Sequence, residues 1–476
     1  MSSLVPDAPA PALLPAGHPP ADLDLPPTAS SWTAATRIAQ VLADRTVADR
    51  SAWALPVTAL AIVSALTLSV AGGVRWFFGV GGENGPLYQG LSSIALVLLV
   101  IPLATLAGAA ARLAASRRDT RLSSLRLLGA TTTTVRVLTL LETGAIALVG
   151  AVVGVVGYLA LMPVFGLLPF NGGPIGPTGL WLGTLPLLGA VAGIVVLTVA
   201  SAAIGLRQVE ISPLGVRTRQ AAPRLHCLRM VVGGVAIVGA IVVAQNMSLL
   251  AQDVATAILY IGLALAVPLL ALNLIGPWVL GLIARWDARR ARTPAALIAA
   301  RTVLDSPKAV WRQVGGLSMI SFVAVIMGVS FSYGANPASS PEEVVMIADL
   351  RTGALLTLGI AFLTVACSVG ITQAAAVLDR RSLHVGLDML GMPLAMIDKA
   401  RRRAIMRPLV VVVVASSLPG LLLVLPLAGY EQVTDPVTLL TTPLLLVTGV
   451  AMVAASLRIT RGTLRSVVAE GIARAE

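Results

Sequence analysis

The stretch Arg117–Gly157, RRDTRLSSLRLLGATTTTVRVLTLLETGAIALVGAVVGVVG, decides how the rest of the chain is interpreted. Its front half is basic and polar, and three leucines recur there at helical spacing, Leu122, Leu125 and Leu128. Gly129 then provides a helix stop, and the threonines after it can cap a new helix. The back half is apolar with Glu142 as its one charge, which a soluble helix hairpin would not show. We predict a short cytoplasmic surface helix, a tight turn and a membrane helix that begins near Val135.

Composition places the chain in the membrane. It is 57% hydrophobic and 12% charged, with a mean hydropathy of +0.89, whereas about a quarter of the residues of soluble domains are charged. The net charge of +12 would suggest nucleic-acid binding in a soluble protein. No zinc-ligand cluster or aromatic and basic stacking surface supports that function. We therefore assign the charge to topology and to the anionic inner leaflet, and we expect no nucleic-acid partner.

Runs of about 20 apolar residues predict the membrane helices. We expect ten, at about 52–73, 91–111, 137–163, 181–205, 230–247, 255–284, 313–333, 353–377, 407–428 and 437–457. The predicted fold class is therefore an all-α integral membrane protein. Because the sixth run contains Pro268 and Pro277, we expect it to be kinked or tilted.

The basic residues determine the orientation of these helices. Ten spans put both termini on one side, and that side holds 32 of the 34 Lys and Arg residues, all except Arg75 and Arg351. The positive-inside rule places this side in the cytoplasm. Arg far outnumbers Lys and Ala is abundant, which indicates a GC-rich bacterial genome and hence a bacterial cytoplasmic membrane. The outer segments are short, rich in Gly and Pro, and too small for a folded domain.

An internal repeat organises the chain. RIAQVLADR at Arg37–Arg45 resembles AARTVLDSP at Ala299–Pro307, an offset of about 262 residues. The first of these stretches lies within Ser31–Asp49, which predicts an interfacial amphipathic leader, with a solvated helix as the alternative. Two parallel copies are expected to be related by a pseudo-two-fold axis along the membrane normal. The predicted domains are a disordered cytoplasmic tail at 1–30, a first unit at 31–225, a connecting two-helix hairpin at 226–290 and a second unit at 291–476.

The opening stretch resembles the cytoplasmic loop and third membrane helix of the FtsX-like permease family. These proteins are membrane subunits of ABC systems and include MacB-type and bacitracin-export-type permeases. The resemblance rests on the basic cluster, on LRLLGA at Leu125–Ala130, on Glu142 and on the glycines after it. A weaker copy, LDMLGM at Leu387–Met392, lies in the second unit. The resemblance implies two four-helix FtsX-like repeats, helices 1–4 and 7–10. The family often carries a large outer domain, and this sequence departs from that pattern.

The resemblance also implies cytoplasmic helices that fit grooves on a separate ABC ATPase. The candidate coupling residues of the first loop are Arg118, Arg121, Leu122, Leu125, Leu128 and Gly129. Those of the second loop are Arg380, Arg381, Leu387, Leu390 and Gly391. Leucines would seat in the groove, and arginines would pair with acidic groups or lipid phosphates. Alternatively the charges are topology signals alone, although topology does not require an apolar stripe.

Inside the predicted spans, two kinds of residue are candidates for a special role. Glu142 is the one intramembrane acidic residue, and an unpaired carboxylate there is costly. It can snorkel or bond to a nearby arginine, and proton coupling is the sharper alternative. The pairs Gly150 and Gly154, and Gly189 and Gly193, have the small-xxx-small spacing that lets membrane helices approach closely. We interpret both pairs as packing seams rather than substrate contacts.

We predict that the chain is the permease subunit of an ABC transporter that exports or extracts an amphiphilic compound or peptide. One alternative is a mechanotransmitting or signalling protein of FtsX type, which the short outer segments disfavour. Another is an ion-coupled secondary carrier, which would require polar groups at mid-membrane that these spans almost lack. No catalytic set is visible, so an enzyme is the least favoured class.

The chain is not expected to hydrolyse ATP itself. A P-loop requires Lys followed by Ser or Thr, but Lys308 and Lys399, its two lysines, both precede alanine. We expect no cofactor in this chain, with ATP and Mg²⁺ bound by a partner ATPase. Because the chain contains both copies of the repeat, we predict one permease for each homodimeric ATPase, a 1:2 complex.

Overall fold

The computed structural model describes residues 50–82, 85–116, 132–176, 178–210, 227–250, 253–333, 341–462 and 464. Ten helices in these ranges are long and apolar enough to cross a membrane. They confirm the predicted all-α, multi-pass membrane protein. The two strands that the structure describes, β1 (Pro169–Phe170) and β2 (Gly173–Pro174), form a small antiparallel hairpin.

The first half of the chain packs four membrane helices together. They are α2 (Arg50–Phe78), α3 (Gly85–Ser116), α5 (Thr132–Gly166) and α6 (Thr184–Glu210). α2 contacts α3 and α5, and α6 contacts α5 and, less extensively, α3 and α2. Long runs of Leu, Val, Ala and Ile allow each helix to satisfy its backbone hydrogen bonds internally, as a lipid environment requires.

A helix hairpin follows, and it packs on the second half. It comprises α7 (Cys227–Gln245), α8 (Met247–Leu250) and α9 (Val254–Arg289). The Asp253 carboxylate caps α9 by accepting the Thr256 amide N–H at 2.9 Å. Further along α9, Asn273 accepts the indole N–H of Trp311 at 2.8 Å, and the same ring lies against Gly276. The absence of a side chain at Gly276 thus lets α9 approach the second half closely.

The second half contains four membrane helices and three short ones. They are α10 (Pro294–Asp305), α11 (Pro307–Tyr333), α12 (Pro341–Asp379), α13 (Arg381–Met389), α14 (Leu394–Ala428), α15 (Tyr430–Thr434) and α16 (Pro436–Ile459). α11 is central, because it contacts α9, α12, α14 and α16. Buried side chains make up 72% of its span, against 11% for the peripheral α6.

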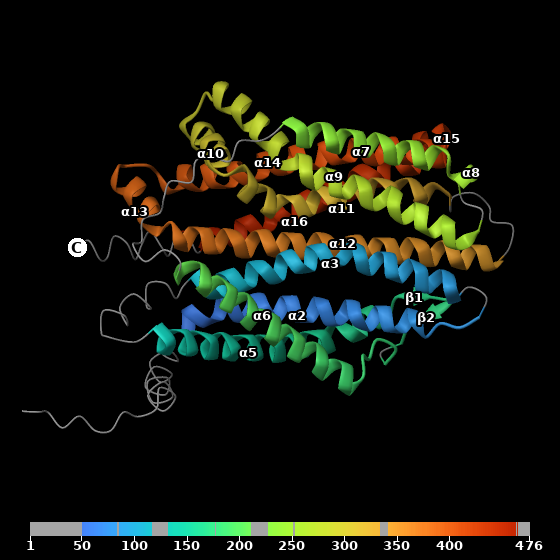
Figure 1. The fold of residues 1–476 in the computed structure, drawn as a ribbon, viewed down its shortest axis with the longest axis horizontal. Helices are drawn as coiled ribbons and strands as arrows, with labels where there is room; N and C mark the ends of the chain where they lie inside the picture. Colours follow the sequence, from blue (N-terminus) through green and yellow to red (C-terminus); the bar gives the residue numbers. More distant parts are fainter. Residues whose placement is uncertain are drawn as a thin grey trace, which may run out of the picture. The chain divides into compact units, whose positions relative to one another are not determined.

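Two helix pairings recur in the two halves, whereas the fourth helices differ, because α6 packs mainly on α5 and α16 packs mainly on α12 and α11. The pairing of α2 with α5 matches that of α11 with α14, and the pairing of α2 with α3 matches that of α11 with α12. The halves meet mainly where α3 lies against α12, the second membrane helix of each half (Figure 1). We call this contact the central seam. A two-fold relation between the halves brings equivalent helices together in this way.

Two helices begin earlier than the apolar runs predict. α12 begins at Pro341 rather than near residue 353, and α14 begins at Leu394 rather than near residue 407. The additional turns carry charged residues, which prediction from apolar runs leaves out. A helix can continue past the bilayer into water, because its backbone hydrogen bonds are made within the helix and do not depend on an apolar sequence.

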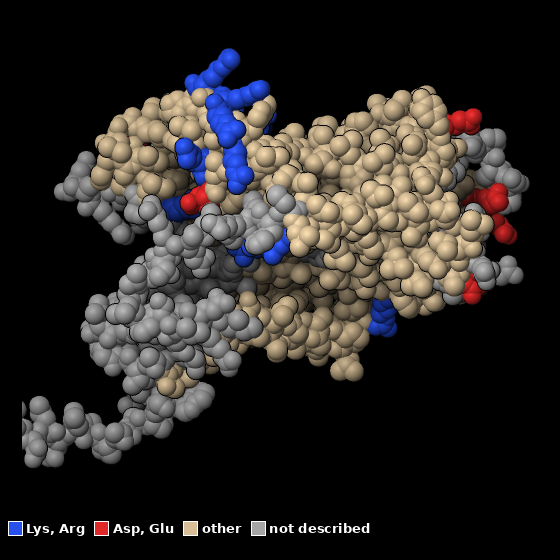
Figure 2. Space-filling model, turned by 45° about the horizontal axis from the view of Figure 1, so that its top comes forward, with Lys and Arg blue, Asp and Glu red and all other residues tan. Residues whose placement is uncertain are grey.

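Charge separates the two ends of the helices. Figure 2 shows Lys and Arg gathered mainly at the end that carries α10 and α13, and Asp and Glu mainly at the opposite end. We call these the basic end and the acidic end. The acidic end includes Glu342 and Glu343 in the first turn of α12 and Glu431 in α15.

Candidate functional site

The first predicted coupling loop lies outside the described residues. This applies to Arg118, Arg121, Leu122, Leu125, Leu128 and Gly129. The flanking helices are described as far as Ser116 of α3 and from Thr132 of α5. Of the two predicted coupling loops, the second is the one whose geometry the structure describes.

The second predicted loop is folded as α13, a separate helix of nine residues. It ends at Gly391, whose φ of +80° is the left-handed conformation that closes helices. The Gly391 amide donates to the Asp388 carbonyl at 2.8 Å, and the Met392 amide donates to the Leu387 carbonyl at 3.0 Å. Pro393 then stands at the start of α14. Glycine and proline together thus separate α13 from the membrane helix that follows.

One face of α13 is anchored to the rest of the chain. A small hydrophobic cluster has Val377, Ile397 and Leu464 at its centre. Leu387 packs against this cluster together with Leu378, Met392 and Leu394. Leu387 therefore contributes to holding the helix in place, and it is half-buried within its own chain.

Three large apolar side chains at α13 are exposed, although Leu387 close to them is packed. Leu390 is 84% exposed, Met389 65% and Leu383 53%. Leu390 was among the predicted coupling residues, whereas Leu383 and Met389 were not. Leu383 lies seven residues before Leu390, on the same face of a helix, and that spacing could have indicated it. Arg380 is also exposed and immediately precedes the helix.

A buried ionic network holds α14 next to this helix. Asp398 is 3% exposed and accepts from Arg401 at 2.9 Å. Arg402 and Arg461 lie at 3.5 and 3.7 Å from the same carboxylate. Arg401 also donates to the Thr460 hydroxyl at 2.9 Å and to the Leu457 carbonyl at 3.2 Å, at the end of α16. The network ties α14 to α16 below the anchored face of α13.

His384 lines a cavity of about 150 Å³ between α13 and the helices behind it. Its Nδ1 atom is buried and has no hydrogen-bond partner among the described residues. Burial lowers the pKa of this imidazole below its ordinary value of 6.5, and the positive charges of Arg401 and Arg380 lower it further. His384 is therefore kept neutral at neutral pH. The burial of His384 could not be predicted from the sequence, because it depends on how α13 packs against α12 and α14.

The glycines of α5 form a close contact with α2. A Cβ atom added at Gly154 would lie 2.4 Å from Ser64 Cβ and 2.8 Å from the Ala61 carbonyl oxygen. One added at Gly150 would lie 2.7 Å from Leu60 Cβ. These distances are shorter than van der Waals contact, so both positions require glycine for the helices to touch. Glu142, one turn or more earlier on α5, is half-buried and is not an unpartnered charge.

Gly189 and Gly193 differ from the α5 glycines. No atom of the described chain lies within 4 Å of a Cβ built at either position. The predicted second seam is therefore not seen between described helices, because this face of α6 has no neighbouring helix there. In the second half, the pairing of α11 with α14 uses a glycine that the spacing did not reveal. A Cβ at Gly420 would lie 3.0 Å from the Phe322 carbonyl oxygen.

Residues 110–211, from the end of α3 to the end of α6, match the family model described as FtsX-like permease C-terminal. This segment is similar to the FtsX-like permease domain. The match confirms the resemblance drawn from the basic cluster, LRLLGA and the α5 glycines. No curated protein matches the chain.

The FtsX-like domain indicates a membrane subunit of an ABC system. Members of this family generally pair with an ABC ATPase. The Gly150 and Gly154 contact lies inside the matched segment, and α2, its partner helix, lies before it. The FtsX-like domain is therefore completed by a helix from the preceding part of the chain.

A second cavity lies at the acidic end of the central seam. It measures about 160 Å³ and is mainly apolar, with walls from α3 and α12. Its one acidic side chain, Asp349, is 5% exposed and accepts the Tyr88 hydroxyl at 2.5 Å and the Asn171 amide at 2.8 Å. Phe77 and Phe170 meet edge to face beside it, with ring centroids 5.2 Å apart. The cavity combines apolar and aromatic walls with one buried carboxylate.

Proposed function

We propose that this chain is the permease subunit of an ABC transporter. A separate ATPase, which binds ATP and Mg²⁺, drives export or membrane extraction of an amphiphilic compound or peptide. The chain is placed in a bacterial cytoplasmic membrane with the basic end and both termini in the cytoplasm, as the positive-inside rule favours.

The exposed apolar face of α13 carries this proposal. Leu383, Met389 and Leu390 are exposed on a helix that the cluster around Val377 fixes to the rest of the chain. A topology signal requires charge and does not require exposed leucines on an anchored helix. Apolar side chains on a rigid, charged surface are typical of a protein-binding site. An ATPase at the basic end would cover them.

The cavity at the central seam supports transport of an amphiphilic substrate. It lies between the halves, where movement of one half relative to the other changes its walls. Its apolar lining suits an acyl chain or apolar peptide side chain, and Tyr88 and Asp349 supply polar contacts. The signalling alternative requires an outer surface large enough to hold a partner protein, and the short outer segments offer little.

Replacement of Leu390 by Asp tests the ATPase-binding surface. We expect the variant to bind its ATPase roughly tenfold or more weakly, since a buried interface anchor contributes about 2 kcal/mol. Stimulated ATP hydrolysis and substrate transport in proteoliposomes should fall with it. The measurements are co-purification with the ABC ATPase and its turnover with and without the permease.

Two variants serve as controls for this experiment. Leu390→Met keeps an apolar side chain and should retain coupling. Leu387→Asp changes a leucine that packs against its own chain, so it should lower the melting temperature, which Leu390→Asp should leave unchanged. Full ATPase stimulation by Leu390→Asp would rule out the proposed surface. Normal ATPase stimulation without transport of any amphiphile would favour signalling.

A further inference from the structure

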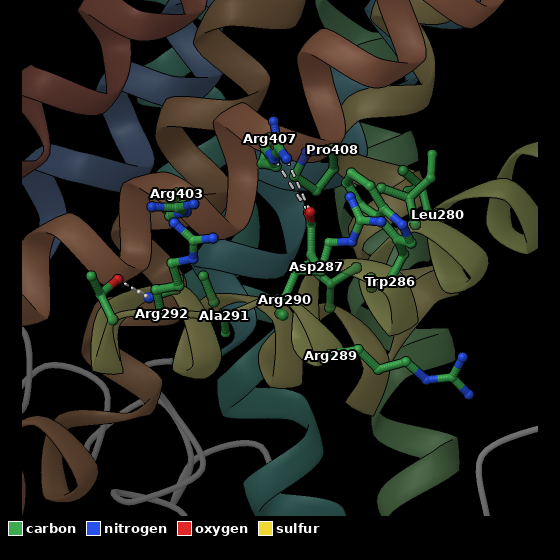
Figure 3. Close-up of a pocket in the computed structure, with 17 residues that line it drawn as sticks. Leu280, Trp286, Asp287, Arg289, Arg290, Ala291, Arg292, Arg403, Arg407 and Pro408 are labelled. Carbon is green, nitrogen blue, oxygen red and sulfur yellow. Dashed lines mark hydrogen bonds and ion pairs between the residues drawn. The ribbon is translucent and has the colours of Figure 1, made fainter.

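A large cavity at the basic end has no part in the ATPase-binding surface. It measures about 720 Å³ and lies where the ends of α9 and α10 meet α14 (Figure 3). Five arginines line it, together with a single acidic residue, Asp287. The arginines are Arg289, Arg290, Arg292, Arg403 and Arg407.

The positive charge of this cavity is only partly compensated. Asp287 pairs with Arg407 through two hydrogen bonds of 3.0 and 3.3 Å. Arg290 lies over the Trp286 ring, 4.3 Å from its centroid. No carboxylate in the described part of the chain lies within ion-pair distance of Arg292 or Arg403.

Arg292 and Arg403 come from different elements and meet at one end of the cavity. Figure 3 shows their side chains near each other, while Arg289 points away. Arg292 precedes α10, and Arg403 lies on α14. Two guanidinium groups in one cavity repel each other unless an anion lies between them. Guanidinium groups bind phosphate in a bidentate manner, which makes phosphate a suitable anion.

The remaining wall of the cavity is apolar. α10 contributes Ala296, Ala299, Ala300 and Val303, which repeat at helical spacing and are buried. α9 contributes Leu280 and Ile283, which belong to its membrane-spanning segment. This wall therefore continues from the arginines toward the hydrocarbon region. Inorganic phosphate makes no apolar contact with this wall, whereas the glycerol and first methylenes of a lipid can pack against it.

We propose that this cavity binds an anionic phospholipid from the leaflet at the basic end. Arg292 and Arg403 hold the headgroup phosphate, and the α9 and α10 wall covers the start of an acyl chain. Trp286, 48% exposed beside the arginines, is the kind of residue found at a membrane interface. Basic pockets between membrane helices on the cytoplasmic side are typical sites for such headgroups. The cytoplasmic assignment of the leaflet rests on the orientation proposed above, and the lipid site itself does not depend on transport.

Native mass spectrometry of the full chain in detergent tests the proposal. The probes are dioleoyl phosphatidylglycerol, dioleoyl phosphatidylcholine and inorganic phosphate. We expect wild type to retain phosphatidylglycerol in preference to phosphatidylcholine. The double variant R292Q/R403Q should bind phosphatidylglycerol roughly tenfold or more weakly, because each arginine near a lipid phosphate contributes about a factor of five.

The matched control is R301Q/R312Q. Both arginines are exposed at the basic end but do not line the cavity, so this variant removes the same net charge elsewhere. It should retain phosphatidylglycerol as wild type does. Equal loss in both variants, or no loss in either, would overturn the site. Displacement of phosphatidylglycerol by inorganic phosphate at a similar concentration would show a simple anion site and would overturn the lipid assignment. No ATPase is present, so neither result bears on the permease function.

Discussion

Arg75 and Arg351 are the basic side chains that the charge partition left on the outer side, and each donates to a backbone carbonyl. Arg75 bonds to the Leu182 carbonyl, and Arg351 bonds to the Phe331 carbonyl. Phe331 lies in the last turn of α11, where carbonyls have no helical partner. A cation there also complements the negative end of the helix dipole. Both exceptions to the positive-inside pattern therefore have a structural role.

His384 makes the packing of α13 against the rest of the chain sensitive to pH. Its pKa is lowered in the folded chain, so between that value and the ordinary 6.5 the unfolded segment binds more protons than the folded one. The stability that neutral His384 contributes to packed α13 is then fully present above about pH 6.5, and it falls as the pH decreases below this value. The protection factors of the amides of residues 381–391, which are corrected for the intrinsic exchange rate at each pH, should be lower at pH 5.5 than at pH 7.5.

The variant His384→Gln removes the titrating group and gives the control. Its hydrogen exchange in α13 should change less between the two pH values, after correction for the intrinsic exchange rate. An equal pH response in wild type and His384→Gln would assign the effect to another group. Arg380 and Arg401 are the charges that act on the imidazole, and both are present in wild type and in the variant.

At the scale of elements, equal sequence patterns have unequal surroundings. Gly154 and Gly193 share the small-xxx-small spacing, but only Gly154 has a neighbouring helix at contact distance. The spacing itself could be predicted, and the presence of α2 beside α5 could not. The same limit applies to α13, where Leu387 and Leu390 look equivalent in sequence, but Leu387 packs against its own chain and Leu390 is 84% exposed.

Substitution by alanine distinguishes the two glycines. Gly154→Ala should destabilise the protein by about 1–3 kcal/mol, because its methyl group meets Ser64 and the Ala61 backbone. Gly193→Ala introduces the same methyl group into open space and should be neutral or slightly stabilising, because alanine favours the helix. Thermal unfolding in detergent measures both. Equal melting temperatures would contradict the close packing of α2 on α5.

At the scale of the whole molecule, the ten spans followed from composition and length, since apolar runs must be helical in lipid. Composition and length do not predict which of those helices pack against each other. The hairpin of α7 and α9 was expected between the two units in sequence, and it packs on the second half. Long-range packing depends on side-chain shape, as in the fit of Trp311 over Gly276, which no local pattern encodes.

We predict that one copy of this chain binds two ATPase subunits. The first membrane helix of each half pairs with the second and with the third, and each half carries a leucine-rich loop motif in its sequence, LRLLGA or LDMLGM. Native mass spectrometry of the complex should give a 1:2 ratio of permease to ATPase. A mass with two permease chains for each ATPase pair would show that the halves are not equivalent docking units.

The central seam also has a consequence for how the protein is made. Tyr88 and Asp349 meet across it although 261 positions separate them in sequence. A ribosome adds about 5–20 residues per second, so roughly 13–50 seconds pass between synthesis of the two residues. During that interval the four helices of the first half can assemble, while the face of α3 that α12 will cover remains without its partner. The first half therefore spends the early life of the nascent chain with this face turned to lipid or to the insertion machinery.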